Sequence, residues 1–174
     1  MSEEEQDGLP ILPHLSSEFY AWLWWASEVK GSVFELGDPV GPVELWVDER
    51  LAFRNAGDTK VSAVMTGEAS STSLEARAAL AGGKVLQELR VGFRRDDREF
   101  SVTLKGPAMH TTSLKIPQVV SDGIDEVLYD RMFLYAEATM VLGGLYSLFS
   151  RLRISEEWDS EVLPTMRGWI WGEL

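Results

Sequence analysis

The sequence predicts an α+β fold, an antiparallel sheet of hairpins with about five or six strands, packed with helices at both ends of the chain. Alternating apolar and polar residues over 84–105 indicate a long β-hairpin. A nearly all-apolar run over 19–25 indicates a buried N-terminal aromatic helix, and apolar periodicity over 125–153 indicates a long helix. A short helix precedes the hairpin, and a last helix after residue 155 forms a long C-terminal helical pair with the helix over 125–153.

The hairpin over 84–105 can be given a register from the sequence alone. A two-residue turn at Asp96-Asp97 brings apolar side chains together on one face and opposite charges together on the other. The predicted cross-strand pairs are Phe93–Phe100, Val91–Val102, Leu89–Leu104, Arg94–Glu99 and Glu88–Lys105. A slip of one residue would turn the apolar set toward water, so this register is well specified.

The remaining strands and the short helix are predicted from turn residues and alternation. A second hairpin turns at Asp48-Glu49, a strand covers 60–66, and another covers 111–116. Thr72 and Glu75 have the spacing of a capping box, which places the start of the short helix there, and Gly82-Gly83 ends it.

Two longer helices have apolar residues on more than one side. The first runs from Ser16 or Ser17 to about Lys30, and the second from 125 to 153 with Gly143-Gly144 marking a kink or a close backbone approach. Such helices either lie in a core or contact another subunit, and both interpretations stay open. The predicted interface residues are Trp22, Trp25, Leu134, Val141, Leu145 and Leu148.

Composition limits the classes of function. The 174 residues contain no cysteine and carry a net charge of −12, which argues against a general nucleic-acid binder. Residues 1–13 are acidic and proline-bracketed, which predicts a flexible N-terminus, and residues 14–174 form one domain. An acidic start without a basic leader and the lack of an 18-residue apolar run favour a cytoplasmic protein without membrane association.

Residues that could carry chemistry are sparse. The two histidines, His14 and His110, stand alone without metal-ligand spacing, and there is no nucleophile elbow or phosphate-binding loop. Asp96-Asp97 lies at a hairpin tip, where aspartate is a common turn residue. The acidic residues Asp122, Asp125, Glu126 and Asp130 lie around a helix start, where the helix dipole stabilises negative charge. We therefore expect no enzyme, no catalytic residue, no metal, no cofactor and no small-molecule substrate.

Positive charge is concentrated in the hairpin region. Residues 84–115 hold seven Lys and Arg against four Asp and Glu, whereas the segments on both sides are acidic. Arg90, Arg94 and Lys105 share the polar face of the hairpin, which could follow a phosphate backbone without reading its sequence. The alternative is that these are ordinary solvated sheet charges, half of them paired with one another.

The order of features resembles a known family. The aromatic helix FYAWLWW at 19–25 is followed by LEARAAL at 74–80 and GKVLQEL at 83–89. The tripeptides TLK at 103–105 and SLK at 113–115 come next, and then a long helix that begins near residue 130. This order resembles the later half of the RdgC family of recombination-associated proteins over roughly residues 17–153. The chain has no counterpart to that family's N-terminal half, and it is more acidic than a DNA clamp.

The resemblance implies a non-enzymatic, nucleoid-associated protein that binds double-stranded DNA without sequence preference and forms a homo-oligomer. The DNA-binding residues that it suggests are Lys84, Arg90, Arg94, Arg95, Lys105 and Lys115. The alternative is an acidic RdgC-derived module that has lost DNA binding and assembles with a protein partner.

Overall fold

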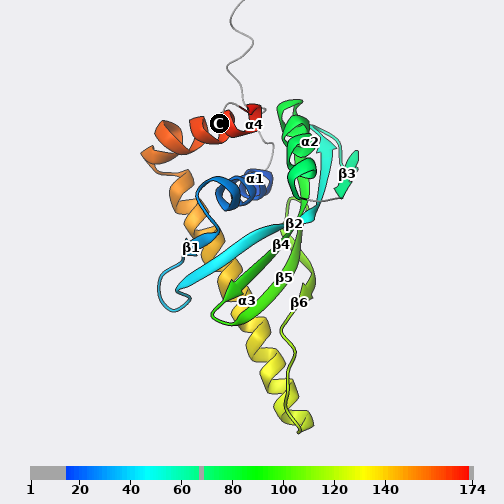
Figure 1. Ribbon diagram of the computed structural model, residues 1–174, viewed down its shortest axis with the longest axis vertical. Coiled ribbons are helices and arrows are strands. Elements are labelled where there is room, and N and C mark those ends of the chain that lie inside the picture. Colours follow the sequence, from blue (N-terminus) through cyan, green and yellow to red (C-terminus); the bar gives the residue numbers. More distant parts are fainter. Residues whose placement is uncertain (1–14, 67–68, 173–174) are drawn as a thin grey trace, which may run out of the picture.

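The computed structural model describes residues 15–66 and 69–172, and helix α1 (Leu15–Val29) lies in its upper half, enclosed by the other helices and the sheet (Figure 1). The helix contacts the sheet on one side, and helices α3 (Ile124–Arg153) and α4 (Leu163–Trp171) on others. Every residue from Phe19 to Ala26 is buried. The missing polar face is therefore explained by burial within one chain.

A hydrogen bond joins α1 to Gly106, the residue that follows the second strand of the predicted hairpin over 84–105. The Tyr20 hydroxyl donates to the carbonyl oxygen of Gly106 over 2.9 Å. Burial raises the pKa of Tyr20 far above its usual value, so the phenol stays protonated and keeps its role as donor.

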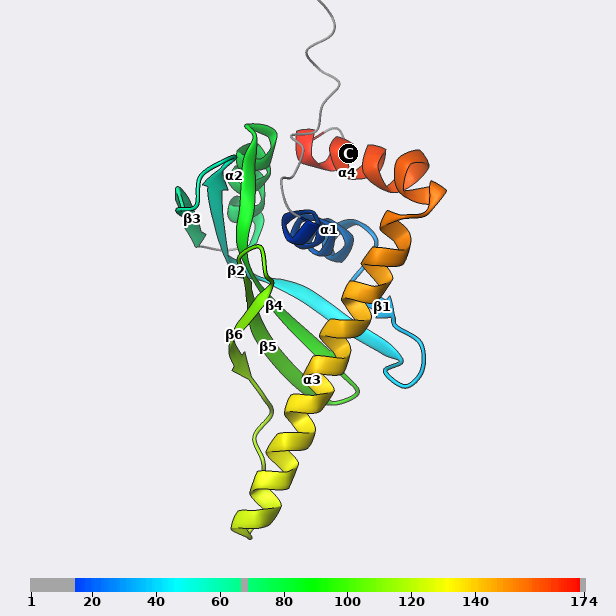
Figure 2. The ribbon, with the colours of Figure 1, turned by 180° about the vertical axis from the view of Figure 1, so that it is seen from behind.

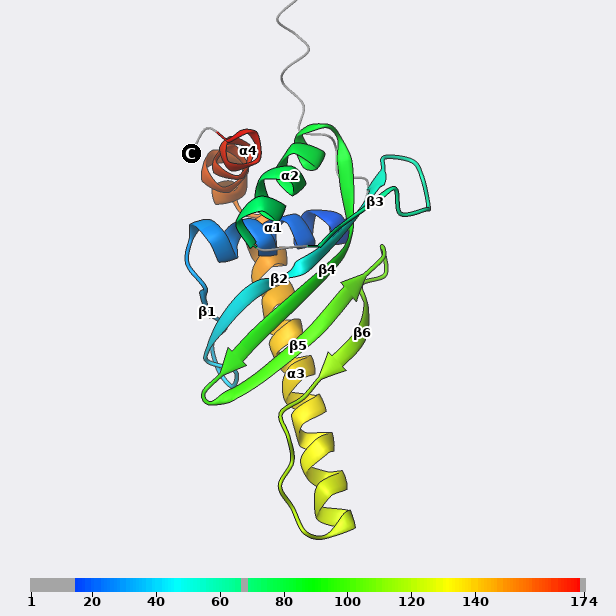
Figure 3. The same cartoon turned by 45° about the vertical axis from the view of Figure 1, so that its right-hand side comes forward.

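Six antiparallel strands form one sheet, which confirms the predicted fold class (Figure 3). The order is β1-β2-β4-β5-β6, with β3 also paired to β2. The strands are β1 (Val33–Glu35), β2 (Pro42–Asn55), β3 (Ala63–Thr66), β4 (Lys84–Arg95), β5 (Arg98–Lys105) and β6 (His110–Lys115).

The predicted register of the β4–β5 hairpin is confirmed at every pair that the sequence specified. The turn falls at Asp96-Asp97, and Asp96 adopts a positive φ of 55°. Phe93 and Phe100 stack with their ring centroids 5.0 Å apart on the side of the sheet that faces α1. The opposite side holds the polar residues.

The predicted hairpin at Asp48-Glu49 is wrong, because the chain continues there as one long strand, β2. Both halves of β2 pair with β4, from Glu44 opposite Arg94 to Asn55 opposite Lys84. The register shifts between Val47 and Leu51, so extra residues are accommodated in a bulge instead of a reversal.

The helices differ from the sequence expectations mainly at their ends. Helix α2 (Ala69–Ala81) begins three residues before Thr72, so the predicted capping box does not mark its start. Helix α3 runs continuously through Gly143-Gly144. A Cβ on Gly144 would lie 3.2 Å from Leu36 Cδ1, so this glycine serves a close approach and causes no break.

The end of the chain folds back over α1. A π-helical turn, η2 (Trp158–Val162), leads into α4, whose first turn contains Pro164. The Glu28 carboxylate accepts hydrogen bonds from the indoles of Trp24, at 2.7 Å, and Trp169, at 3.2 Å. These bonds join α1 to α4. The predicted flexible segment 1–13 lies outside the described residues.

The pair Gly92 and Trp46 gives a test of the sheet's polar side. The two residues are direct neighbours on β4 and β2, and a Cβ on Gly92 would overlap the Trp46 indole. We expect Gly92→Ala to lower the free energy of unfolding by ~2 kcal/mol, because the ring must leave its rotamer. Urea denaturation measures this loss. In a Trp46→Leu background the same change should cost much less, and an equal cost in both backgrounds would contradict the overlap.

Candidate functional site

The predicted DNA-binding face of the hairpin carries ion pairs between neighbouring strands. Arg90 Nε lies 2.9 Å from Asp48 Oδ2, and an Arg94 guanidinium nitrogen lies 2.7 Å from Glu44 Oε2. Both carboxylates come from β2, which the sequence did not place beside β4. Arg94 is opposite Glu99 as predicted, but its ion pair forms with Glu44 on the other side.

Lys105 also has a carboxylate partner. Its ammonium lies 3.6 Å from Glu88, which agrees with the cross-strand pair read from the sequence. Glu88 is buried and has a second cationic neighbour in Arg50, at 3.3 Å. The hairpin's polar side is therefore a set of alternating charges that largely compensate one another.

Arg95 projects to the helix side of the sheet instead. It follows Phe93 by two residues, so the two side chains leave β4 on the same face. Arg95 lies 2.8 Å from Glu137 on α3, and it also donates to the carbonyl oxygens of Val40 and Pro39. Its guanidinium thus joins α3 to the sheet.

Glu137 has a second arginine partner in Arg98, at 2.9 Å. The Glu137 side chain is only 2% exposed, so a carboxylate with two guanidinium groups lies inside the fold. Arg98 also lies over the Phe133 ring, 5.8 Å from its centroid. Sequence reasoning missed this cluster, although Glu137 is the sole charged residue between Met132 and Ser150.

Lys84 and Lys115 are the two predicted DNA-binding residues that form no ion pair or side-chain hydrogen bond within the described ranges. Lys84 begins β4 opposite Asn55, and Lys115 ends β6 opposite Ser101. Lys84 lies on the central strand of the hydrogen-bonded order and Lys115 on the edge strand β6, with β5 between them. The structure therefore does not gather the six predicted residues into one cationic surface.

The predicted subunit-interface residues lie inside the chain's own core. Trp22, Trp25, Leu134, Val141 and Leu145 are buried, and Leu148 is half-buried and packed against the same core. Their assignment to an interface needs correction, because a single chain already covers them. The core interpretation, left open by the sequence, is the one that the structure shows.

A third side of α3 remains uncovered, and sequence reasoning did not separate it from the buried sides. Figure 2 shows α3 crossing in front of the sheet, with its N-terminal turns extending beyond the strands. Met132 and Phe133 are 58% and 59% exposed there. The helix is long and apolar enough to span a membrane by length and composition, with 33% of its most apolar window buried. One of its sides nevertheless packs on α1 and the sheet.

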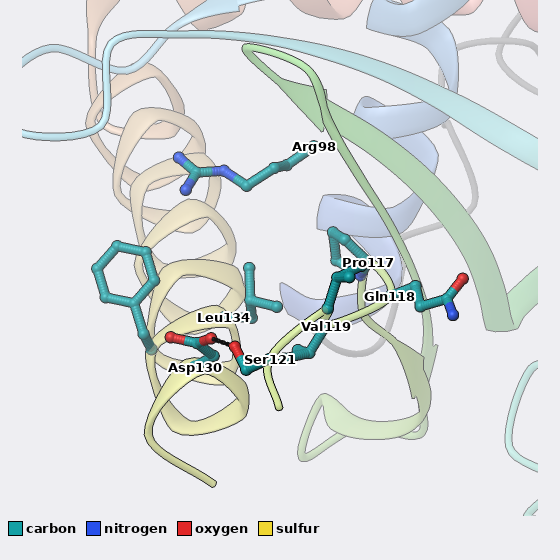
Figure 4. A pocket seen from close by; sticks show the side chains of 9 residues that line it. Arg98, Pro117, Gln118, Val119, Ser121, Asp130 and Leu134 are labelled. Atoms are coloured by element: carbon teal, nitrogen blue, oxygen red, sulfur yellow. Dashed lines mark hydrogen bonds between the residues drawn. The ribbon is translucent and has the colours of Figure 1, made fainter. Parts of the chain in front are cut away.

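A cavity of about 380 Å³ lies between α3 and the segment that follows β6 (Figure 4). Three of the polar side chains that line it already have partners: Ser121 donates to Asp130 over 2.5 Å, and Arg98 binds Glu137. No group of three or more metal-ligating side chains occurs in the described part of the chain. The Gln118 amide points away from the other lining side chains (Figure 4), so the cavity offers no convergent set of free polar groups of the kind that orient a bound ligand.

The buried cluster around Glu137 predicts a large difference between two carboxylates. We expect Glu137→Gln to lower the free energy of unfolding by ~3 kcal/mol, because two guanidinium groups lose their common counter-ion inside the fold. Glu44→Gln, at an exposed ion pair with Arg94, should cost less than ~1 kcal/mol. Chemical denaturation of both variants measures the difference. Equal losses would show that Glu137 does not anchor α3.

Comparison with known proteins identifies no relative of this chain. No family model matches the chain, and no match is found among curated proteins or among solved structures. The resemblance to the RdgC family therefore stays a prediction from the sequence.

Proposed function

We propose that this chain is a non-enzymatic protein-assembly module that binds another protein chain through the uncovered side of α3. This is the second of the two functions that the sequence left open. One observation carries it: the solvent-facing side of a long helix lacks charged residues over about five turns.

The absence of charge can be followed along the helix. Between Met132 and Ser150 the single charged residue is Glu137, and it points inward to Arg95 and Arg98. A helix on the surface of a globular protein normally presents charged residues on its outer side. A quarter of this chain is charged, so a neutral outer side is not explained by composition.

The uncovered side is also apolar where it is most exposed. Tyr129, Met132, Phe133 and Met140 each expose 43–70% of their surface in the described structure. They follow one another at the three- and four-residue spacing of a single helix side, so they form a continuous patch. Contiguous exposed apolar surface on a soluble domain typically marks a protein contact.

Binding of double-stranded DNA, which the RdgC resemblance suggests, is the second candidate. Lys84 and Lys115 favour it, because neither has a carboxylate partner among the described residues. The ion pairs of Arg90, Arg94, Arg95 and Lys105 weigh against it, because a phosphate would have to displace a carboxylate at each. Net charge of −12 adds repulsion.

A gel-shift titration with duplex DNA separates the two candidates. We expect no shift at about 0.1 M salt, because few uncompensated cations remain to release counter-ions from the phosphates. A shift that weakens steeply with salt, and disappears on replacing Arg90, Arg94 and Lys105 by glutamate, would instead establish DNA binding.

The assembly function is tested by a photo-crosslinking residue, benzoylphenylalanine, at Met140 in the full-length chain in cells. We expect a covalent adduct of defined mass on denaturing gels, because Met140 lies in the middle of the uncovered side. The matched control places the same residue at Asp159, an exposed position in the π-helical turn, where no adduct should form. Absence of an adduct at Met140 would contradict the assembly function.

A further inference from the structure

The uncovered side of α3 changes character from one end to the other. At 100° per residue, positions three and four apart share one side of the helix. The residues on this side are Asp125, Tyr129, Met132, Phe133, Ala136, Met140, Gly143, Ser147, Ser150 and Arg151. Bulky side chains fill its N-terminal half, and small ones fill its C-terminal half.

The two ends of this side carry opposite charges. Asp125 stands before the apolar stretch and Arg151 after it, and neither forms an ion pair within the described residues. The sequence midpoint between Tyr129 and Ser150 falls between Thr139 and Met140. Size and charge are therefore both inverted about the middle of the helix.

An inverted pattern is what a two-fold symmetric contact requires. In an isologous contact the same patch meets itself in reverse, so each end of the patch faces the other end in the partner. A patch with bulky residues and an acid at one end, and small residues and a base at the other, is complementary to its own reversed copy.

We propose that the protein α3 binds is a second copy of this chain, with the two α3 helices antiparallel about an axis near Thr139 and Met140. This inference rests on the proposed assembly function and names its partner. It places Met132 against Ser147 of the second copy and Ala136 against Gly143. Asp125 then lies near Arg151 of the second copy, at the rim.

Local packing supports this arrangement. Side chains of one helix enter the grooves of the other, and glycine and serine at 143 and 147 leave room for Met132 and Phe133. A Cβ on Gly143 would meet nothing within 4 Å in the single chain, so no contact inside the fold requires this glycine. Close approach of a second helix explains it.

A parallel pair fits worse on the same criteria. It would set Asp125 against Asp125 and Arg151 against Arg151, which is repulsive at both ends. It would also put Tyr129 and Met132 against themselves while glycine and serine face each other across a gap. Figure 2 shows no other element in front of α3, so the antiparallel approach is open along the helix.

Single cysteines test the register, because the natural chain contains none. We expect oxidised mixtures of Met132→Cys and Ser147→Cys chains to give a disulfide-linked heterodimer. Met132→Cys alone should stay unlinked, because two copies of residue 132 lie roughly 22 Å apart along antiparallel helices. Asp159→Cys is the control for random oxidation. A dimer from Met132→Cys alone would overturn the antiparallel register.

Sedimentation velocity of the full chain supplies the second measurement. We expect Met140→Glu to raise the dimer dissociation constant at least tenfold, because two unpaired carboxylates would be buried near the axis. Leu74→Glu, which also replaces an exposed apolar residue but lies on α2, should change it less than twofold. Circular dichroism confirms that both variants fold.

The outcomes separate this inference from the function on which it rests. A chain that stays monomeric at all concentrations, yet gives a Met140 adduct of a mass other than twice its own, overturns self-pairing and leaves the assembly function standing. A monomer without any adduct overturns both. Flotation with neutral phosphatidylcholine vesicles, lost in Met140→Glu, would overturn self-pairing in favour of a lipid surface.

Discussion

Burial of α1 on all sides is the constraint on which the structure depends. Eight consecutive residues, from Phe19 to Ala26, are removed from water, and they include three tryptophans. No single layer can cover such a helix, so the sheet, α3 and α4 must all be in place. Because aromatic side chains bury the largest areas of any residues, this one helix contributes a large part of the hydrophobic stabilisation.

Local sequence patterns predicted most of the helices and strands. The features they did not predict depend on contacts between elements that are distant in the sequence. The β4–β5 register followed from alternation and cross-strand charge, both properties of adjacent residues. The continuity of β2 did not, since Asp48-Glu49 is favourable in a turn and equally tolerable in a bulge once β4 lies alongside. The start of α2 at Ala69 shows the same limit, because a capping spacing at Thr72 does not prevent earlier turns from forming.

The candidate site was predicted less well, because whether a charged side chain on a strand forms an ion pair depends on which strand lies beside it. Arg90 and Arg94 were correctly placed on the polar side, but their partners Asp48 and Glu44 are some 40–50 residues away in sequence. The exposed side of α3 could have been found from the sequence, since a neutral outer side needs only the helical period. It was missed because α3 has apolar residues on three sides. Its hydrophobic pattern therefore does not distinguish buried from exposed residues unless the positions of α1 and the sheet are known.

The contact between α1 and α4 has a consequence for synthesis on the ribosome. The aromatic helix is synthesised well before Trp169, which lies edge-on to Trp24 with ring centroids 4.7 Å apart and follows it by 145 residues. At 5–20 residues per second, roughly 7–30 seconds pass between the synthesis of Trp24 and that of Trp169. During this interval the nascent chain carries uncovered indole rings, so productive folding must wait until α4 has left the ribosome or rely on a chaperone that shields α1.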